Sequence, residues 1–251
     1  MPNVVLMMSD EHNPRYASPY GHRTIKTPAM ARLASEGVVF ENGYCPSPLC
    51  MPSRSAFVSG QRVHLLQTYS NCNLGVDPTP QSFGAALSSQ GVYTAYIGKT
   101  DVYTPGHKLG FDEMRLAIDR APPGDTNHRR NPLAIRPGAD QRASGYGPRT
   151  DAGSGDRHCV DEAVSWLQSV APQLEQPWVL IVNVTNPHFP HYAEPELWEL
   201  YEGAGDLPAY GSEVASAQHP FARALQDHFQ TGAFSDSDVR GLRRGYLACI
   251  T

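Results

Sequence analysis

The residues best suited to chemistry in this chain form a short motif, in which residues 50–54 read Cys-Met-Pro-Ser-Arg. A proline at this point predicts a helix start, and Cys50 would then lie near a helix N-terminus, where unpaired N–H groups favour tetrahedral oxyanions. Arg54, one turn further on, is placed to neutralise negative charge on such an anion. A single cysteine is usually an inert buried thiol. The whole motif instead favours a site for an anionic substrate.

Polar side chains also follow three apolar segments that the sequence predicts to be buried strands. The predicted strands cover residues 3–8, 92–97 and 178–184. The polar residues that come after them, in chain order, are Asp10 and Glu11, Lys99 and Asp101, and His188 and His191. Because the carboxyl ends of parallel strands meet at one edge of a sheet, we expect these side chains to converge there.

Predicted helices alternate with the strands. The first begins at Pro28, after Thr27, and stops at Gly37, because threonine caps a helix, proline suits its first turn and glycine ends it. The expected helices cover residues 28–36, 53–58, 82–89, 161–170 and 236–251. We also expect a strand over 38–40 and a long aperiodic loop excursion over about 115–157. The alternation predicts an α/β fold with a mainly parallel central sheet and helices on both faces.

Composition narrows the class of partner. The chain has 251 residues, with 20 basic and 25 acidic residues and a net charge of −5, so we expect neither nucleic acid nor an anionic membrane as a partner. There is no apolar run of the roughly 20 residues that span a bilayer and no basic leader, which predicts a cytoplasmic protein. The five cysteines have no CxxC spacing, which argues against a disulfide framework or a structural zinc site. A small molecule is the expected partner.

The motif at residues 50–54, with Ser59-Gly60 downstream, resembles the CxPSR signature of the type I sulfatases. Other landmarks of that family occur in the same order along the chain. They are the opening strand before Asp10, the helix after Thr27-Pro28, Gly98-Lys99, Asn186-Pro187-His188, and Arg244 with Tyr246. The chain is identified as a member of this formylglycine-dependent family, which implies an alkaline phosphatase-like fold.

The resemblance implies a reaction and a set of roles. A maturation enzyme would oxidise Cys50 to formylglycine, whose hydrate attacks the sulfur of a small sulfate ester and passes through a covalent sulfated intermediate. Asp10, Glu11 and residue 50 would hold a divalent cation, most readily Ca²⁺, with Mg²⁺ or Mn²⁺ as alternatives. Arg54, Lys99 and His188 would offset charge on the transferred group and serve the leaving oxygen.

Some positions depart from the family pattern or lie close to it without an assigned role. Many relatives have histidine where this chain has Asp101, and His107 is the candidate substitute. Glu11 stands where many relatives have a second aspartate. His12, Asn13, His64 and His191 are candidates for substrate contact, and Cys45, Cys72, Cys159 and Cys249 are expected to be structural.

Length leaves the function open among three alternatives. Family chains are longer, so we expect residues 1–251 to be the N-terminal portion of a sulfatase catalytic domain, C-terminally incomplete, without the remaining metal ligands or the C-terminal subdomain. The alternatives are a sulfuric ester hydrolase, a phosphonate or phosphate ester hydrolase of the same superfamily, and an inactive truncated fragment. The particular ester, the metal and the oligomeric state are left open by the sequence.

Overall fold

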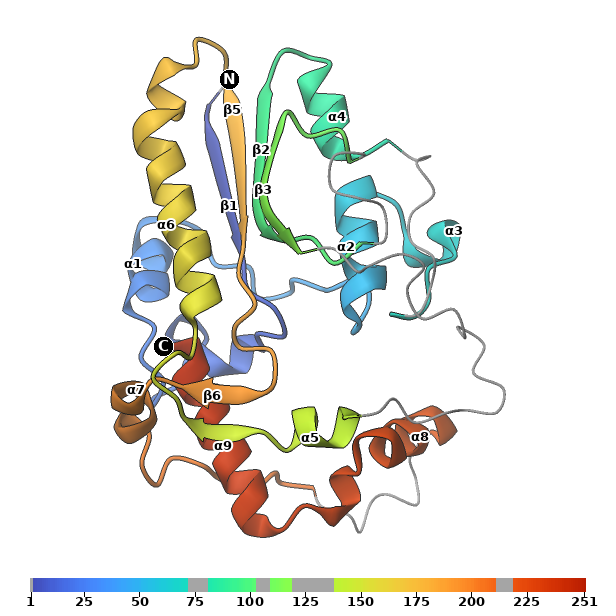
Figure 1. Cartoon of the computed structure of the whole chain (residues 1–251), viewed down its shortest axis with the longest axis vertical. Coiled ribbons are helices and arrows are strands. Elements are labelled where there is room, and N and C mark those ends of the chain that lie inside the picture. Colours follow the sequence, from blue (N-terminus) through green and yellow to red (C-terminus); the bar gives the residue numbers. More distant parts are fainter. Residues whose placement is uncertain (1, 72–80, 103–108, 119–137, 211–218) are drawn as a thin grey trace. The chain divides into compact units, whose positions relative to one another are not determined.

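A computed structural model describes residues 2–71, 81–102, 109–118, 138–210 and 219–251 (Figure 1). His107 and Cys72 therefore lie outside the described residues. The chain forms two compact units. Unit 1 comprises Met1–Asp10, Asn42–Asn131 and Gly155–Thr185, and unit 2 comprises Glu11–Glu41, Pro132–Ser154 and Asn186–Thr251.

Unit 1 is built on a four-stranded sheet in which every pair of neighbouring strands is parallel. Its strands, in spatial order, are β1 (Val4–Met8), β5 (Trp178–Asn183), β2 (Tyr93–Lys99) and β3 (Glu113–Ile118). β5 is central and apolar, as expected for a parallel strand that is buried on both faces. The predicted α/β class and its parallel sheet are confirmed.

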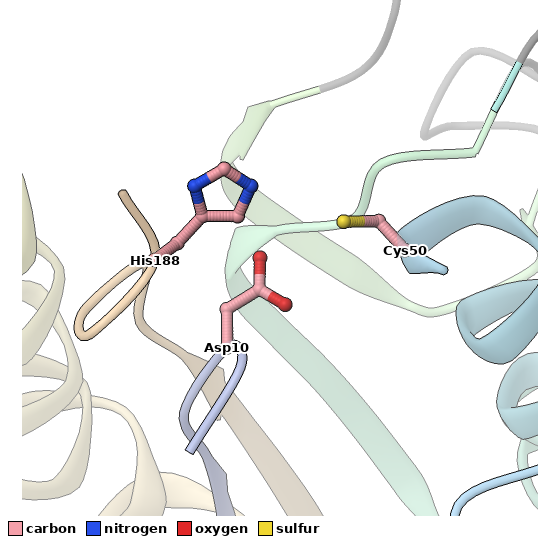
Figure 2. A group of neighbouring side chains, drawn as sticks. All are labelled: Asp10, Cys50 and His188. Atoms are coloured by element: carbon pink, nitrogen blue, oxygen red, sulfur yellow. The ribbon is translucent and has the colours of Figure 1, made fainter. Parts of the chain in front are cut away.

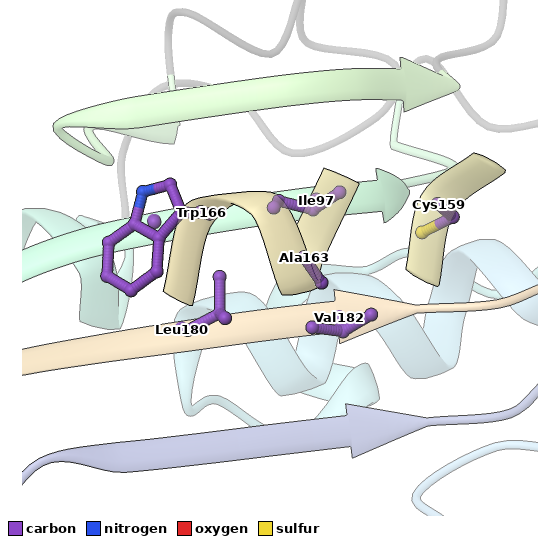
Figure 3. Packing of buried hydrophobic residues seen from close by; sticks show 7 residues of the cluster. Ile97, Cys159, Ala163, Trp166, Leu180 and Val182 are labelled. Atoms are coloured by element: carbon purple, nitrogen blue, oxygen red, sulfur yellow. The ribbon is translucent and has the colours of Figure 1, made fainter. Parts of the chain in front are cut away.

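One face of this sheet packs against α6 (Ser154–Ser169) (Figure 3). Trp166 of α6 is completely buried, and it shares a cluster with Leu180 of β5 and Ile97 of β2. Its indole Nε1 donates a hydrogen bond of 2.8 Å to the carboxylate of Glu113, which helps to lower the pKa of that carboxyl against the opposing effect of burial. The polar end of the tryptophan is thus satisfied where its ring is buried.

The opposite face packs against α2 (Cys50–Ser59) and α4 (Phe83–Ser88), while α3 (Val63–Leu66) adjoins α2. Tyr96 and Ile181 point to this side because neighbouring residues of a strand alternate between the two faces. Val58 of α2 is buried in the same cluster. Helices therefore cover both faces of the sheet, as predicted.

Unit 2 contains a small parallel pair of strands, β4 (Tyr146–Pro148) and β6 (His191–Ala193). α9 (Asp236–Ile250) packs on β6, and its buried Leu247 and Ala248 meet Ala193 and Tyr201. The other helices are α1 (Pro28–Glu36), α5 (Ala139–Ala143), α7 (Pro195–Leu200) and α8 (Pro220–Phe229). Among the described residues of both units, no helix combines the length and apolar character needed to cross a bilayer.

Several predicted boundaries are wrong. Residues 38–40 do not form a strand, and Val38 and Phe40 are 78% and 74% exposed. Apolar residues with high strand propensity form a strand only where a neighbouring strand is available to pair with them. α2 begins at Cys50 instead of Ser53. The predicted loop over 115–157 contains most of β3, all of α5 and β4, and the first turn of α6. Elements of three to six residues are too short to produce a readable period.

Gly98 in β2 provides a test of this packing. Its φ is +96°, and a Cβ there would lie 2.2 Å from the carbonyl oxygen of Asn183 and 2.6 Å from the sulfur of Cys159. We expect Gly98→Ala to lower the free energy of unfolding by about 3 kcal/mol or more, through strain and overpacking, in urea denaturation. Gly155→Ala in α6, where nothing lies within 4 Å of the new Cβ, is the matched control and should cost nothing. Equal effects of the two substitutions would contradict the prediction.

Candidate active site

Three predicted site residues lie where elements of unit 1 begin or end. Asp10 follows β1, Lys99 is the last residue of β2, and Cys50 is the first residue of α2. β1 and β2 run parallel in one sheet, so their carboxyl ends lie at the same edge. Figure 2 shows the side chains of Asp10 and Cys50 pointing toward one another, and a carboxylate oxygen of Asp10 lies within 4.8 Å of the Cys50 sulfur.

Asp10 and three other charged side chains lie close together in this unit. The Lys99 ammonium donates a short hydrogen bond to Oδ2 of Asp10, and Nη2 of Arg54 lies 3.8 Å from Oδ1. The same ammonium lies 3.9 Å from Oδ2 of Asp101. These side chains are only 5% to 11% exposed. Two cationic side chains therefore balance two carboxylates. Such pairing is needed because an unpaired buried charge is costly. We call these four residues the buried charge cluster.

The backbone of Lys99 is held as firmly as its side chain. Its carbonyl oxygen accepts hydrogen bonds from Arg54 Nη1 at 2.8 Å, from the Tyr96 hydroxyl at 3.0 Å and from Asn183 Nδ2 at 3.1 Å. The pairing of β2 with β3 also shifts register between Ile97 and Lys99. Ile97 pairs with Arg115 and Lys99 with Ile118, so the extra residue of this bulge lies on β3, beside the end of β2 that carries Lys99.

Asn183 and Tyr96 are supporting residues that the sequence analysis missed. Both are buried, and the Asn183 amide also donates to the Tyr96 hydroxyl. A signal was present, because Asn183 interrupts the apolar run of β5, and a buried amide requires partners. The tyrosine gave no such signal, since its ring is ordinary core material in a strand.

Two further predicted site residues, Glu11 and His188, belong to unit 2. His188 Nε2 lies 3.3 Å from Oε1 of Glu11, and its Nδ1 lies 2.5 Å from the carbonyl oxygen of Phe189. Figure 2 draws His188 on the segment that follows β5. The chain leaves unit 1 directly before Glu11 and again at Thr185, three residues before His188. The covalent chain thus ties both residues to strand ends of unit 1.

Unit 2 also holds a cavity of about 670 Å³. The rings of Tyr16 and Tyr246 meet edge to face in it, and the Tyr246 hydroxyl donates to the carbonyl oxygen of Glu11 and accepts from the backbone N–H of Asn13. Asn13 and His191 of the predicted substrate contacts line the cavity, whereas His12 and His64 do not. The full lining is Glu11, Asn13, Arg15, Tyr16, His22, Thr24, His191, Ala204, Asp206, Leu242, Arg243, Tyr246 and Leu247.

His191 opens β6 and is held by unit 2 in a neutral form. Burial, together with an electrostatic effect of the neighbouring His188, lowers the pKa of His191 to about 4, against the opposing effect of a backbone hydrogen bond to Pro187. Its ring lies edge to face against the ring of Tyr246, with 5.5 Å between the ring centroids. A histidine that stays neutral at physiological pH offers a hydrogen bond without a charge.

The stability of the protein should depend on pH through His191. Between pH 6.5 and about 4, His191 binds a proton in the unfolded chain but not in the folded protein. The free energy of unfolding should therefore fall as the pH drops through this window. The loss from this residue should approach about 3 kcal/mol near pH 4. Urea denaturation across that window should show a shallower dependence for His191→Gln. The exposed His158→Gln is the control and should keep the wild-type dependence, and a His191→Gln profile that matches it would refute the assignment.

Comparison with known proteins identifies the family of this chain. The model of the Sulfatase family matches residues 2–236. A choline-sulfatase of Rhizobium meliloti (strain 1021) is 28% identical over 267 residues, which cover 100% of this chain and 51% of that protein. Arylsulfatase K of Danio rerio is 31% identical, over 98% of this chain and 48% of that protein. The chain thus spans about half the length of these curated relatives.

The fold is also that of a solved structure, the phosphonate monoester hydrolase of Agrobacterium radiobacter, with a TM-score of 0.72 and 20% identity over 100% of this chain and 56% of that one. This likeness concerns the fold, which is alkaline phosphatase-like. The match to the family model spans nearly the whole chain and includes the cysteine motif, Lys99 and His188. This protein belongs to the sulfatase family.

Proposed function

We propose that the protein of which this chain forms part is a sulfuric ester hydrolase. The observation that carries the proposal is the position of Cys50, at the start of α2 and within 4.8 Å of a carboxylate whose neighbours are two buried cations. A sulfate ester is a tetrahedral anion, and it needs such cations beside a nucleophile. The substrate we expect is a small sulfate ester.

Cys50 is the proposed nucleophile after its conversion to formylglycine by a maturation enzyme. The hydrate of that aldehyde supplies an oxygen nucleophile where the unmodified residue has a sulfur. Residue 50 is partly buried at a helix N-terminus, and its neighbour Met51 donates its backbone N–H to Asn71. The first turn is therefore held in place before any substrate arrives, which favours a fixed line of attack.

The oxygen donors of the site fit a hard divalent cation. Asp10 presents a buried carboxylate toward residue 50, and Glu11 follows it directly in the chain. We propose these residues, with residue 50, as ligands for Ca²⁺, with Mg²⁺ or Mn²⁺ as alternatives. The cation would supply positive charge that polarises a sulfate oxygen. Glu11 faces His188 at 3.3 Å, so His188 competes for the same carboxylate.

Arg54, Lys99 and His188 have separate proposed roles. Arg54 holds a sulfate oxygen through its guanidinium, which its bond to the Lys99 carbonyl keeps in one orientation. Lys99 offsets the negative charge that develops during transfer. His188 passes a proton from its ring to the leaving oxygen, and the nearby Glu11 carboxylate orients the ring.

The first test is the mass of the tryptic peptide of residues 33–54 from protein made in its native host. We expect residue 50 to carry an aldehyde in place of its CH₂–SH group, while Cys45 in the same peptide remains a thiol. Cys50→Ala should then lower the hydrolysis of an aryl sulfate by at least about 10³-fold, because the nucleophile is lost. An unmodified Cys50, or an alanine variant with undiminished activity, would refute the proposed mechanism.

A phosphonate or phosphate ester hydrolase is the second candidate, favoured by the likeness in fold to the phosphonate monoester hydrolase. The same nucleophile and cations suit a tetrahedral phosphorus centre. Parallel assays with aryl sulfate and aryl phosphonate esters should give the larger kcat/KM for the sulfate. A larger kcat/KM for the phosphonate would make the phosphonate ester hydrolase the favoured function. If Cys50 is converted and the 251-residue chain hydrolyses neither ester, the third alternative, an inactive fragment, applies to this chain.

A further inference from the structure

Asp101 is the member of the buried charge cluster for which the proposed function has no use. It stands where sulfatases often have a histidine, it is buried, and its backbone φ of 53° lies in the left-handed region. Its Oδ2 lies 3.9 Å from the ammonium group of Lys99, whose present hydrogen-bond partner is Asp10. Buried residues held in strained backbone conformations cluster at functional sites, where the strain is part of the mechanism.

We propose that Asp101 is a positioning residue that receives the ammonium group of Lys99 when a divalent cation takes Asp10. This inference rests on the proposed function, because it assigns Asp10 to a cation. The ammonium bond to Oδ2 of Asp10 occupies an oxygen that a cation would need. Metal uptake therefore requires that Lys99 lose this partner, and a buried ammonium without a partner is costly.

The distances favour an exchange of partners. A movement of about 1 Å would bring the ammonium from 3.9 Å to hydrogen-bonding distance from Asp101. The backbone of Lys99 does not need to move, since three donors hold its carbonyl oxygen. A flexible four-carbon side chain with three donor hydrogens can make such an exchange.

Charge balance leads to the same conclusion. Arg54 and Lys99 are balanced by Asp10 and Asp101 before a cation arrives. A divalent cation adds two positive charges, so an uncharged residue at position 101 would leave the positive charges facing one another in a buried site. Asp101 thus favours cation binding in two ways, by accepting the ammonium and by its own negative charge.

The experiment is a calorimetric Ca²⁺ titration of the 251-residue chain at one fixed pH. We expect Asp101→Asn to raise the dissociation constant by about tenfold or more, and Asp101→Glu to restore it to within about threefold of wild type. Asp161→Asn, at an exposed position of α6, makes the same change of charge and should bind Ca²⁺ as wild type does. Urea denaturation of each variant without Ca²⁺ checks that it is folded, and Asp101→Glu serves if the asparagine variant is not.

A double-mutant cycle separates an exchange of partners from a general structural effect. Lys99→Met removes the competitor for Asp10, so it should tighten Ca²⁺ binding. In that background Asp101→Asn should weaken binding by a factor at least about threefold smaller than in the wild-type background. An equal factor in both backgrounds, an Asp101→Asn variant with wild-type affinity, or no Ca²⁺ uptake by the wild-type chain would each overturn the inference.

These outcomes are distinct from failure of the proposed function. Conversion of Cys50 and hydrolysis of the ester are measured without reference to Asp101. Protein that is converted and active, but whose Ca²⁺ affinity ignores Asp101, overturns only the role of Asp101. Protein with an unmodified Cys50 overturns the proposed hydrolase mechanism, whatever the titration gives.

Discussion

Two buried cations and two buried carboxylates meet at the carboxyl edge of the unit 1 sheet, and each is tolerated there only because the opposite charge is close. Removing one partner from such a set leaves an uncompensated charge, at a typical cost of about 3–5 kcal/mol. An apolar replacement of similar volume often costs nothing, so ion pairs of this kind are poor evidence of selection for stability. Positive charge held in place before an anion arrives is, however, useful for chemistry on sulfate esters.

The rest of unit 1 can be understood as the support for this cluster. β1 and β2 deliver Asp10 and Lys99 to the same edge because they are parallel strands of one sheet. Gly98 permits the close approach of β2 to the carbonyl of Asn183, which no other residue would allow. α6 and the tryptophan at its centre hold β5 and β2 together from one face.

The division into two units falls at the site residues themselves. Asp10 ends one segment of unit 1 and Glu11 opens unit 2, while Thr185 and Asn186 mark a second crossing shortly before His188. Unit 1 carries Cys50 and the buried charge cluster, and unit 2 carries His188 and a cavity with aromatic and charged walls.

The sequence by itself determined the α/β class, the parallel sheet and the position of Cys50 near a helix start, because strand and helix periods and a helix-start proline are local properties. It also determined which polar residues follow β1, β2 and β5. Only the tertiary structure decided that residues 38–40 stay unpaired, that the region after β3 contains short elements, and that Asp101 faces Lys99. Pairing of strands, short elements and contacts between distant side chains depend on partners far along the chain, which no local pattern encodes.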